Sequence, residues 1–242
     1  MPAIETRQLT KQYKDVTAVD RLDLTVEEGE LFGLLGVNGA GKTTTVKMLS
    51  TLTAPTAGEA TVLGLDLRTQ GEKLKSRIAV SPQETAVAPN LTVRENLELM
   101  CGVHGFSREK TRERTEAMLR DLSLKEVEQR RAAKLSGGWQ RRLSIAMALI
   151  SEPRLLFLDE PTLGLDVLAR EELWDVIRAL RGTVTMILTT HYMEEAEALC
   201  DRVAVMKDGH LMAVDNPAAL MERTGTDSLE RAFVALVKEG RA

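Results

Sequence analysis

Residues 36 to 43 read Gly36-Val37-Asn38-Gly39-Ala40-Gly41-Lys42-Thr43, which fits the pattern G-x-x-x-x-G-K-[ST]. The apolar run Leu31 to Leu35 before it has the length of a strand, and Lys42 to Ser50 after it has the apolar period of a helix. A strand that enters and a helix that leaves form the context in which this pattern makes a phosphate-binding loop. The stretch therefore predicts an α/β fold that holds a nucleotide.

The loop offers several kinds of phosphate donor. Its glycines let successive backbone N–H groups point at the β-phosphate, and the start of the following helix adds partial positive charge. Lys42 reaches the β- and γ-phosphates, Thr43 offers a hydroxyl to Mg²⁺, and Thr44 adds another donor. The residues expected to contact the nucleotide here are Gly36, Asn38, Gly39, Ala40, Gly41, Lys42, Thr43 and Thr44.

Two acids, Asp159 and Glu160, follow the apolar run Leu155 to Leu158. Because parallel strands end at one edge of a sheet, both carboxylates are expected beside the phosphate loop. Asp159 is placed to hold Mg²⁺, directly or through water, and Glu160 to take a proton from, or orient, the attacking water. General-base action of this kind contributes on the order of 10²–10⁴ in rate.

Two further polar side chains follow strand-like runs. Gln83 comes after Ile78 to Val80, where its amide is able to touch Mg²⁺ or the attacking water. His191 comes after Val184 to Leu188, where its ring is able to hydrogen-bond the γ-phosphate. Taken alone, each residue fits a structural role as well as a functional one.

Strands and helices alternate over most of the chain. Helical patterns at Leu168 to Leu180 and Met193 to Leu199 each precede a strand-like run, which is typical of a mainly parallel sheet covered by helices. The expected strands are Val19–Val26, Leu31–Leu35, Ala60–Leu63, Ile78–Val80, Leu155–Leu158, Val184–Leu188 and Val203–Val205. The sequence thus indicates one α/β core.

The strand pattern stops between Pro89 and Ile150. Three helices are expected there, Val93–Val103, Ser107–Leu122 and Gly138–Ile150, the second with Ser107 as its N-cap. We therefore expect a large domain over residues 1–226, with its α/β core at 1–83 and 151–226 and an inserted helical subdomain at 84–150. A short C-terminal helix is expected within 227–242.

The composition argues against two classes of protein. With a net charge of -4, a pI near 5.6 and 3% aromatic residues, the chain has no overall basic field and few base-stacking side chains, so nucleic acid is not expected as a partner. No apolar stretch approaches the roughly 20 residues that a helix needs to cross a bilayer. The N-terminus lacks the apolar core of a secretory signal, so the chain is expected in the cytosol.

Two further features are expected to be structural. Cys101 and Cys200 lack Cys-x-x-Cys spacing and are expected to be buried thiols without metal or redox chemistry. Arginine and glutamate alternate along Ser107 to Leu122, which predicts a solvated helix face with i,i+4 ion pairs.

Residues 135 to 142 read Leu135-Ser136-Gly137-Gly138-Trp139-Gln140-Arg141-Arg142, and with them the chain resembles the nucleotide-binding subunits of ABC transporters from about Ile4 to Ala219. Phosphate loop, glutamine loop, signature, acid-ended strand, D-loop and switch histidine each occur once, in the family's order. The resemblance implies a P-loop NTPase of the ABC type. Its expected parts are a mainly parallel sheet core, a helical signature subdomain and an N-terminal antiparallel β portion.

The resemblance also implies roles for single residues. It implies that Tyr13 stacks on the adenine of ATP and that Gln83 links the nucleotide state to a membrane partner. It further implies that Glu160 is the catalytic carboxylate and that His191 is the γ-phosphate switch. The expected reaction is hydrolysis of ATP with Mg²⁺ as cofactor.

The signature implies a second chain. Ser136, Gly137 and Gly138 precede a helix start, where they can present a hydroxyl and N–H groups to phosphate. In the family these groups face the ATP held by the other subunit, and Asp166, in the stretch Leu163-Gly164-Leu165-Asp166, resembles the D-loop acid at that interface. Since this chain has one phosphate loop and one signature, two complete sites need two chains arranged head to tail, either as a homodimer or as a heterodimer.

The chain departs from the family pattern at three places. Trp139 stands where a glutamine is commoner, although Gln140 follows it, and Val37 replaces a frequent proline. Val167 and Leu168 replace a frequent Asp-Pro after the D-loop. The first two departures remove no group that the expected chemistry needs, whereas the third leaves the geometry of the D-loop open.

The sequence around the motifs is most similar to ATPases of ABC-2 type exporters of the daunorubicin-resistance kind. Such subunits energise an integral membrane permease, so the expected place of the chain is the cytoplasmic face of the membrane, as a peripheral subunit. The competing interpretation is a soluble ABC ATPase that acts as an assembly or mechanical factor without a permease. The chain has no zinc-type cysteine cluster or long coiled-coil insertion to favour that competitor.

Overall fold

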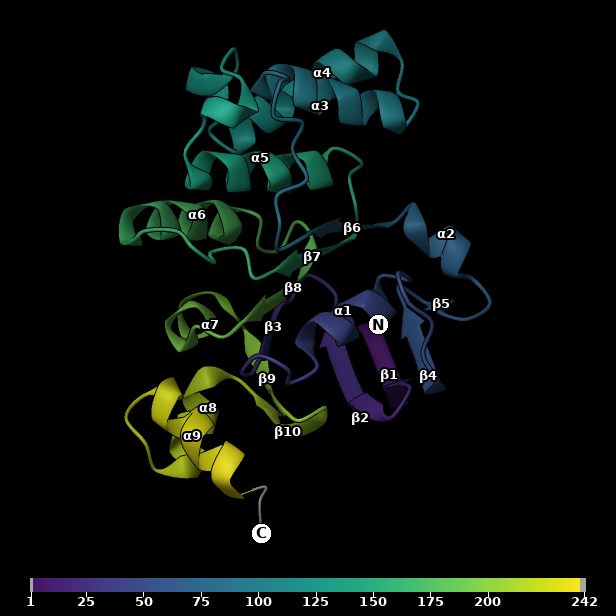
Figure 1. Cartoon of the computed structure of the whole chain (residues 1–242), viewed down its shortest axis with the longest axis vertical. Helices are drawn as coiled ribbons and strands as arrows, with labels where there is room; N and C mark the ends of the chain where they lie inside the picture. The colour runs from purple at the N-terminus through teal and green to yellow at the C-terminus, as the bar shows by residue number, and fades with distance from the viewer. Residues whose placement is uncertain (1, 240–242) are drawn as a thin grey trace.

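A computed structural model describes residues 2–239 and contains two sheets flanked by helices (Figure 1). The larger sheet has six strands in the order β10-β9-β3-β8-β7-β6, and all its neighbours are parallel except β10, which is antiparallel to β9. The strands are β3 (Leu31–Leu35), β6 (Ile78–Ser81), β7 (Leu155–Asp159), β8 (Thr185–Thr190), β9 (Arg202–Lys207) and β10 (His210–Asp215).

The central strands of this sheet are buried on both faces. Every residue of β3, β7 and β8 is buried, and Phe32 and Phe157 are among the largest side chains with no exposed surface. Such continuous apolar runs are what a parallel sheet covered by helices on both sides requires. The strand ends are therefore held rigidly, and side chains that follow them are positioned by the core.

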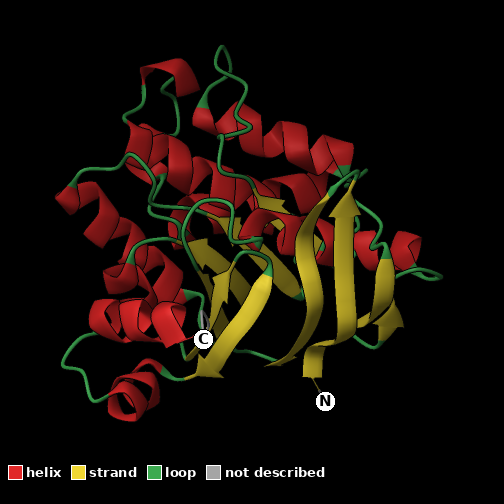
Figure 2. Cartoon of the chain, turned by 60° about the horizontal axis from the view of Figure 1, so that its bottom comes forward, coloured by secondary structure: helices red, strands yellow, loops and turns green. Residues whose placement is uncertain are grey.

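The smaller sheet is antiparallel and contains the first strand of the chain (Figure 2). Its order is β2-β1-β4-β5, with β1 (Pro2–Tyr13), β2 (Val16–Glu27), β4 (Ala57–Val62) and β5 (Leu65–Asp66). In the long β1–β2 hairpin, residues 21–27 alternate between exposed and buried, as a sheet with one solvated face does. This sheet confirms the expected antiparallel β portion, and the two sheets together confirm the predicted α/β class.

Three of the helices, α3 (Val93–Val103), α4 (Arg108–Asp121) and α5 (Gly137–Leu149), lie between β6 and β7 in the chain and form the top of Figure 1. The first begins with a capping box, in which Thr92 accepts from Glu95 N and the Glu95 carboxylate accepts from Thr92 N. The predicted N-cap Ser107 accepts from Lys110 N. The domain limits proposed from the sequence stay a prediction.

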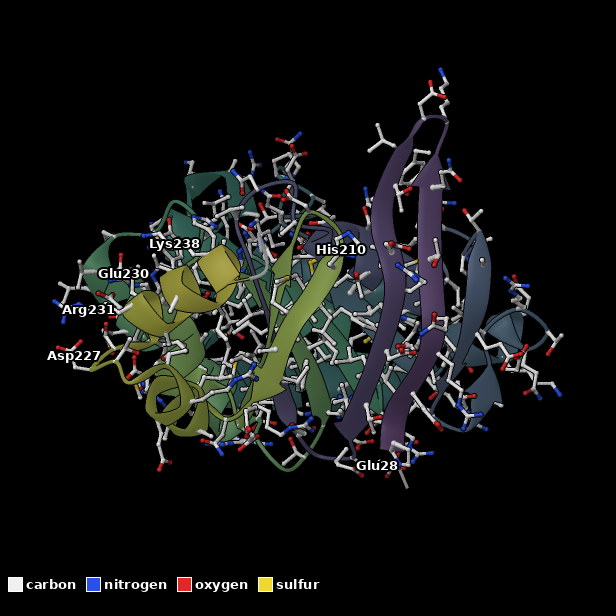
Figure 3. The ribbon with its side chains drawn as sticks, turned by 90° about the horizontal axis from the view of Figure 1, so that it is seen from below. Glu28, His210, Asp227, Glu230, Arg231 and Lys238 are labelled. Carbon is white, nitrogen blue, oxygen red and sulfur yellow. The ribbon has the colours of Figure 1, made fainter. Side chains whose placement is uncertain are left out.

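The other α-helices of the described residues lie outside this inserted segment. They are α1 (Lys42–Leu49), α2 (Gly71–Lys75), α6 (Val167–Ala179), α7 (Met193–Leu199), α8 (Pro217–Thr224) and α9 (Leu229–Glu239). The last of these buries Leu229, Ala232, Phe233 and Leu236. Figure 3 shows its charged residues Glu230, Arg231 and Lys238 on the outer side of the helix. The strands β1, β5 and β10 and the helices α2 and α8 were not among the segments expected from the sequence, although the resemblance implied an N-terminal antiparallel β portion.

The charged face of α4 differs from the sequence prediction. Its ion pairs are not spaced i,i+4 within the helix: Lys110 pairs with Glu113 at i,i+3, and Glu116 pairs with Arg94 of α3 at 2.7 Å. The same guanidinium reaches Glu128 at 2.6 Å. The predicted i,i+4 pairing was wrong, because a long arginine from the neighbouring helix α3 reaches Glu116 in place of a residue one turn away. The predicted solvated face is confirmed, since Arg108, Arg112 and Glu113 are exposed.

The structure of residues 2–239 bears on two expectations, one about membrane-spanning helices and one about the cysteines. In this part of the chain no helix combines the length and the apolar character that crossing a membrane requires. Cys101 and Cys200 are both buried and free, as expected. Burial raises the pKa of each thiol, so both stay protonated near neutral pH and neither is a reactive thiolate.

Candidate functional site

The loop between β3 and α1 is shaped by its glycines. Gly39 and Gly41 have φ angles of +84° and +103°, which other residues rarely adopt. A Cβ at Gly36 would lie 2.6 Å from the Met206 carbonyl oxygen, and one at Gly41 would lie 2.6 Å from the Ala18 carbonyl oxygen. The loop therefore packs closely against the backbone of β9 and β2, and only glycine fits at these turns.

A cavity of about 790 Å³ opens over this loop. Besides the loop, it is lined by Gln83 after β6, Glu160 after β7 and His191 after β8, which the parallel order of the strands brings to one sheet edge. The full lining is Val16, Thr17, Ala18, Asn38, Gly39, Ala40, Gly41, Lys42, Thr43, Thr44, Gln83, Glu160, Leu163, His191 and Asp208. Most of the residues that the sequence analysis singled out thus meet in one pocket.

Lys42 is the buried cation of the pocket. Its Nζ donates to the carbonyl oxygens of Gly36 at 2.6 Å and Val37 at 3.3 Å, and it lies 3.5 Å from Glu160 Oε1. The side chain is only 5% exposed, so its charge is poorly screened by water. An ammonium aimed along a cradle of loop amides fits a triphosphate, whose oxygens can replace the carbonyl partners.

Glu160 lies between this cation and the histidine. Its Oε2 is 2.8 Å from Nδ1 of His191, although the two groups are not aligned as a hydrogen bond. The Glu160 backbone is left-handed, with a φ angle of +49°, which turns the chain sharply at the end of β7. The carboxylate is thereby held in the pocket, where it is able to accept a proton from water.

Asp159 lies one residue earlier and is buried behind the loop. Its Oδ1 accepts from Thr189 Oγ1 at 2.5 Å and from Thr43 Oγ1 at 3.3 Å. A carboxylate beside a hydroxyl is the kind of oxygen pair that Mg²⁺ prefers, so these residues fit the expected metal. The backbone N–H of Glu160 donates to the same Thr189 hydroxyl at 3.0 Å. Thr189 therefore joins both acids, a role that the sequence analysis missed.

Thr189→Val should test this link. Valine keeps the shape and the strand preference but removes the hydroxyl that donates to the buried Asp159 carboxylate at 2.5 Å, at a cost of about 1–3 kcal/mol. The Glu160 N–H keeps its bond to the Thr189 carbonyl oxygen at 3.1 Å. We expect the melting temperature to fall by about 2–4 °C per kcal/mol. Calorimetry measures this fall, and Thr183→Val, at an exposed hydroxyl that bonds Leu180 O, should leave the melting temperature nearly unchanged.

Tyr13 lies at the end of β1 and outside the residues that line the cavity. Its side chain is 44% exposed, and the Lys11 ammonium lies 4.8 Å from the ring centroid. Val16, in the next strand, is 65% exposed and does line the cavity. Adenine stacking by Tyr13 stays a prediction.

The signature residues are also absent from the described lining of the cavity. Ser136 is the N-cap of α5, which begins at Gly137, one residue earlier than predicted. The first N–H groups of a helix have no partner within it, so the two glycines still offer donors. A Cβ at Gly138 would lie 3.1 Å from the Cβ of Ala169, and one at Gly137 would lie 3.3 Å from Leu165 Cδ2. Glycine lets α5 pack closely against the D-loop and α6.

Asp166, the last residue of the D-loop, has a structural partner in the helix that follows. Its carboxylate accepts from Ala169 N at 2.9 Å and so caps the N-terminus of α6. The two residues that replace the family's Asp-Pro follow it in α6, where Val167 is 63% and Leu168 is 76% exposed. The loop is therefore well formed without those family residues.

Comparison with known proteins bears directly on this arrangement. Residues 19–163, more than half of the chain, match the family described as ABC transporter. The chain belongs to the ABC transporter family. It is accordingly an ATP-binding protein and an ATP hydrolase of this family, and the pocket over the phosphate loop is its candidate nucleotide site.

Relatives in the ABC transporter family cover most of the chain. It is 43% identical to the daunorubicin/doxorubicin resistance ATP-binding protein DrrA of Streptomyces peucetius, over 94% of this chain and 69% of that protein. It is 43% identical to the Nod factor export ATP-binding protein I of Rhizobium etli, over 92% of this chain and 71% of that protein.

A solved structure has the same fold. It is a dimeric post-hydrolysis state of the ATP-binding cassette MJ0796 bound to ADP and Pi, with a TM-score of 0.78, 26% sequence identity, and coverage of 88% of this chain and 98% of that chain. The likeness supports the ABC fold of this chain over nearly the whole of that cassette.

Proposed function

We propose that this chain is the ATP-hydrolysing subunit of an ABC-2 type membrane exporter and that it works as one half of a head-to-tail dimer. One observation carries the dimer: the cavity brings together the phosphate loop, Glu160 and His191, whereas Ser136 to Gly138 lie outside its lining. A signature that serves no nucleotide in its own chain is available to serve the nucleotide of another.

Hydrolysis in this proposal uses groups that already lie in the pocket. Lys42 and the loop amides neutralise negative charge on the phosphate oxygens. This stabilisation becomes stronger as charge develops in the transition state. Glu160 accepts a proton from the attacking water. His191, whose Nδ1 lies 2.8 Å from that carboxylate, hydrogen-bonds the γ-phosphate and so detects its presence. Mg²⁺, when bound, would add charge neutralisation at the phosphate oxygens. Thr43, Asp159 and Gln83 are the residues that would hold it.

The proposed power stroke is closure of two chains around two nucleotides, followed by hydrolysis and reopening. ATP favours the closed dimer because each nucleotide would touch the phosphate loop of one chain and the signature of the other. After hydrolysis the linkage between the chains is weaker, and they separate. The two chains can be identical or siblings.

The membrane partner in this proposal is an integral permease, and the chain would sit on the cytoplasmic face of the membrane. The names of the two relatives, which concern drug resistance and Nod factor export, support an exporter. A docking region between Gln83 and Phe106 is supported by apolar residues on α3, where Leu99 is 48% and Val103 is 70% exposed.

Mixing two inactive variants would test the shared site. Lys42→Met removes the phosphate-loop cation, and Ser136→Asp keeps a good N-cap residue but aims a negative charge at the partner's phosphates. Each variant alone should be inactive. If the chain forms homodimers, half of the dimers in a 1:1 mixture of the two variants contain one chain of each variant. Each of these dimers has one intact site out of two, so about a quarter of the wild-type ATPase activity should return.

The control for this test is a mixture of the single variant Lys42→Met with a double variant that carries both Lys42→Met and Ser136→Asp. No dimer in this mixture has an intact site. This mixture should stay inactive. If the first mixture also stays inactive although both variants are folded, the head-to-tail dimer of identical chains is wrong. Copurification of the active chain with a membrane fraction would then test the permease separately.

A further inference from the structure

Arg141 is a buried arginine to which the proposed mechanism assigns no role. It lies in α5, one turn after Gly137, and only 4% of its surface is exposed. A guanidinium carries five N–H donors and keeps its charge, so burial is costly unless the surroundings bind it. Its partners therefore indicate what the protein gains from it.

The guanidinium binds main-chain carbonyls of two other segments. Nη1 donates to the Pro82 oxygen at 2.6 Å, and Nη2 donates to the Gln83 oxygen at 2.6 Å. Nη2 also lies 3.5 Å from the carbonyl oxygen of Glu160. Residues 82 and 83 follow β6 and Glu160 follows β7, so one side chain joins α5 to the ends of two adjacent strands.

These contacts fix the backbone of two residues whose side chains line the nucleotide pocket, Gln83 and Glu160. Glu160 is held from both ends of the residue, because its N–H donates to Thr189 Oγ1 at 3.0 Å and its carbonyl faces Arg141. Since the acceptors are backbone oxygens, Arg141 transmits position to the pocket without taking part in its chemistry.

The charge around Arg141 suits a permanent cation. Burial lowers the pKa of the guanidinium, and the negative charges of Asp159 and Glu195 oppose that change. Two carbonyl oxygens bound by two different nitrogens match the planar fork of arginine, whereas lysine offers one point charge. The site is thus specific for arginine in geometry as well as in charge.

We propose that Arg141 is a positioning residue, which holds the Gln83 loop and the Glu160 turn in register with the signature helix α5. The proposal rests on the proposed function, in which this helix touches the nucleotide of the partner chain. A displacement of α5 at one nucleotide would then shift Gln83 and Glu160 at the other. Arg141 would couple the two sites of the dimer.

Two substitutions would test the coupling in the full chain. Arg141→Met removes all donors at similar length, and Arg141→Lys keeps the charge but loses the fork. We expect Arg141→Met to lower kcat for ATP by about 10- to 100-fold, because small misplacement of reacting groups is that costly. The Kd for ATP should stay within about threefold, since Lys42 and the loop are untouched. Arg141→Lys should fall between Arg141→Met and wild type.

The matched control is Arg114→Met. Arg114 of α4 also binds two backbone carbonyls at α5, those of Leu149 at 3.0 Å and Ile150 at 3.2 Å, but at the opposite end of that helix from the signature. Its loss should lower thermal stability and leave kcat nearly unchanged.

All rates are measured below the melting temperature of each variant, and Arg141→Lys replaces Arg141→Met if the latter does not fold. Three results would overturn the proposal: a normal kcat in the Arg141 variant, an equal loss of kcat in Arg114→Met, or a loss confined to ATP affinity. A wild-type chain without ATPase activity would instead contradict the proposed function.

Discussion

Glu160→Gln should lower kcat for ATP hydrolysis by about 10²–10⁴-fold while ATP binding persists. The amide keeps the size of the side chain but cannot take a proton from water. Binding should not weaken, because the substitution removes a negative charge that lies 3.5 Å from Lys42 and close to the site of the phosphates. Steady-state phosphate release and equilibrium ATP binding measure the two quantities on one preparation.

The control for this prediction is Glu194→Gln, a neutralised acid in α7 that is 79% exposed and 3.6 Å from Arg170. It should hydrolyse ATP like the wild type. Near-normal turnover in Glu160→Gln would remove Glu160 from its catalytic role, and a parallel loss of ATP binding would mean that the carboxylate has a structural task in the loop.

Lys42→Met should nearly abolish ATP binding. The substitution removes the buried cation and leaves the Glu160 carboxylate without its ion-pair partner at 3.5 Å. Truncating one partner of a buried charge pair typically costs about 2–5 kcal/mol. Applied to the phosphate contact, this corresponds to ATP binding that is weaker by about 30- to 5,000-fold.

Titration with a fluorescent ATP analogue would measure the loss. Lys47→Met is the matched control, because Lys47 lies in the last turn of the same helix and is exposed. It should bind as the wild type does. If Lys42→Met bound ATP with unchanged affinity, the cavity over the loop would not be the nucleotide site.

The sequence predicted most of the fold because its apolar runs are long and strongly bounded. All seven expected strands are present, since runs such as Leu155 to Leu158 are buried on both faces and carry no competing pattern. The strand β10 was missed because its residues are only partly buried at the edge of the sheet. The helix α2 was missed because it has five residues and one buried side chain, Leu74.

The nucleotide pocket was predictable where side chains carry the chemistry. Lys42, Gln83, Glu160 and His191 line one cavity, as their places after successive strands indicated. The signature and Tyr13 lie outside that lining. The spacing of motifs along one chain does not show which of them share a pocket.

The residues that hold the pocket residues in position could not be predicted from the sequence. Thr189 is one threonine among several, and its hydroxyl matters only because parallel pairing places it beside Asp159. Arg141 binds backbone carbonyls, which every residue possesses, so no pattern of side chains marks its partners. Both depend on contacts between segments far apart in the chain.

The left-handed backbone at Glu160 has a consequence for how this position can evolve. A φ angle of +49° costs a residue with a side chain roughly 1–2 kcal/mol, and glycine avoids most of that cost. If Glu160 has the proposed catalytic role, selection for turnover would keep an acid there against this bias. A descendant that no longer needed hydrolysis would gain folding stability from glycine at this site, so the acid would be among the first residues to disappear by drift.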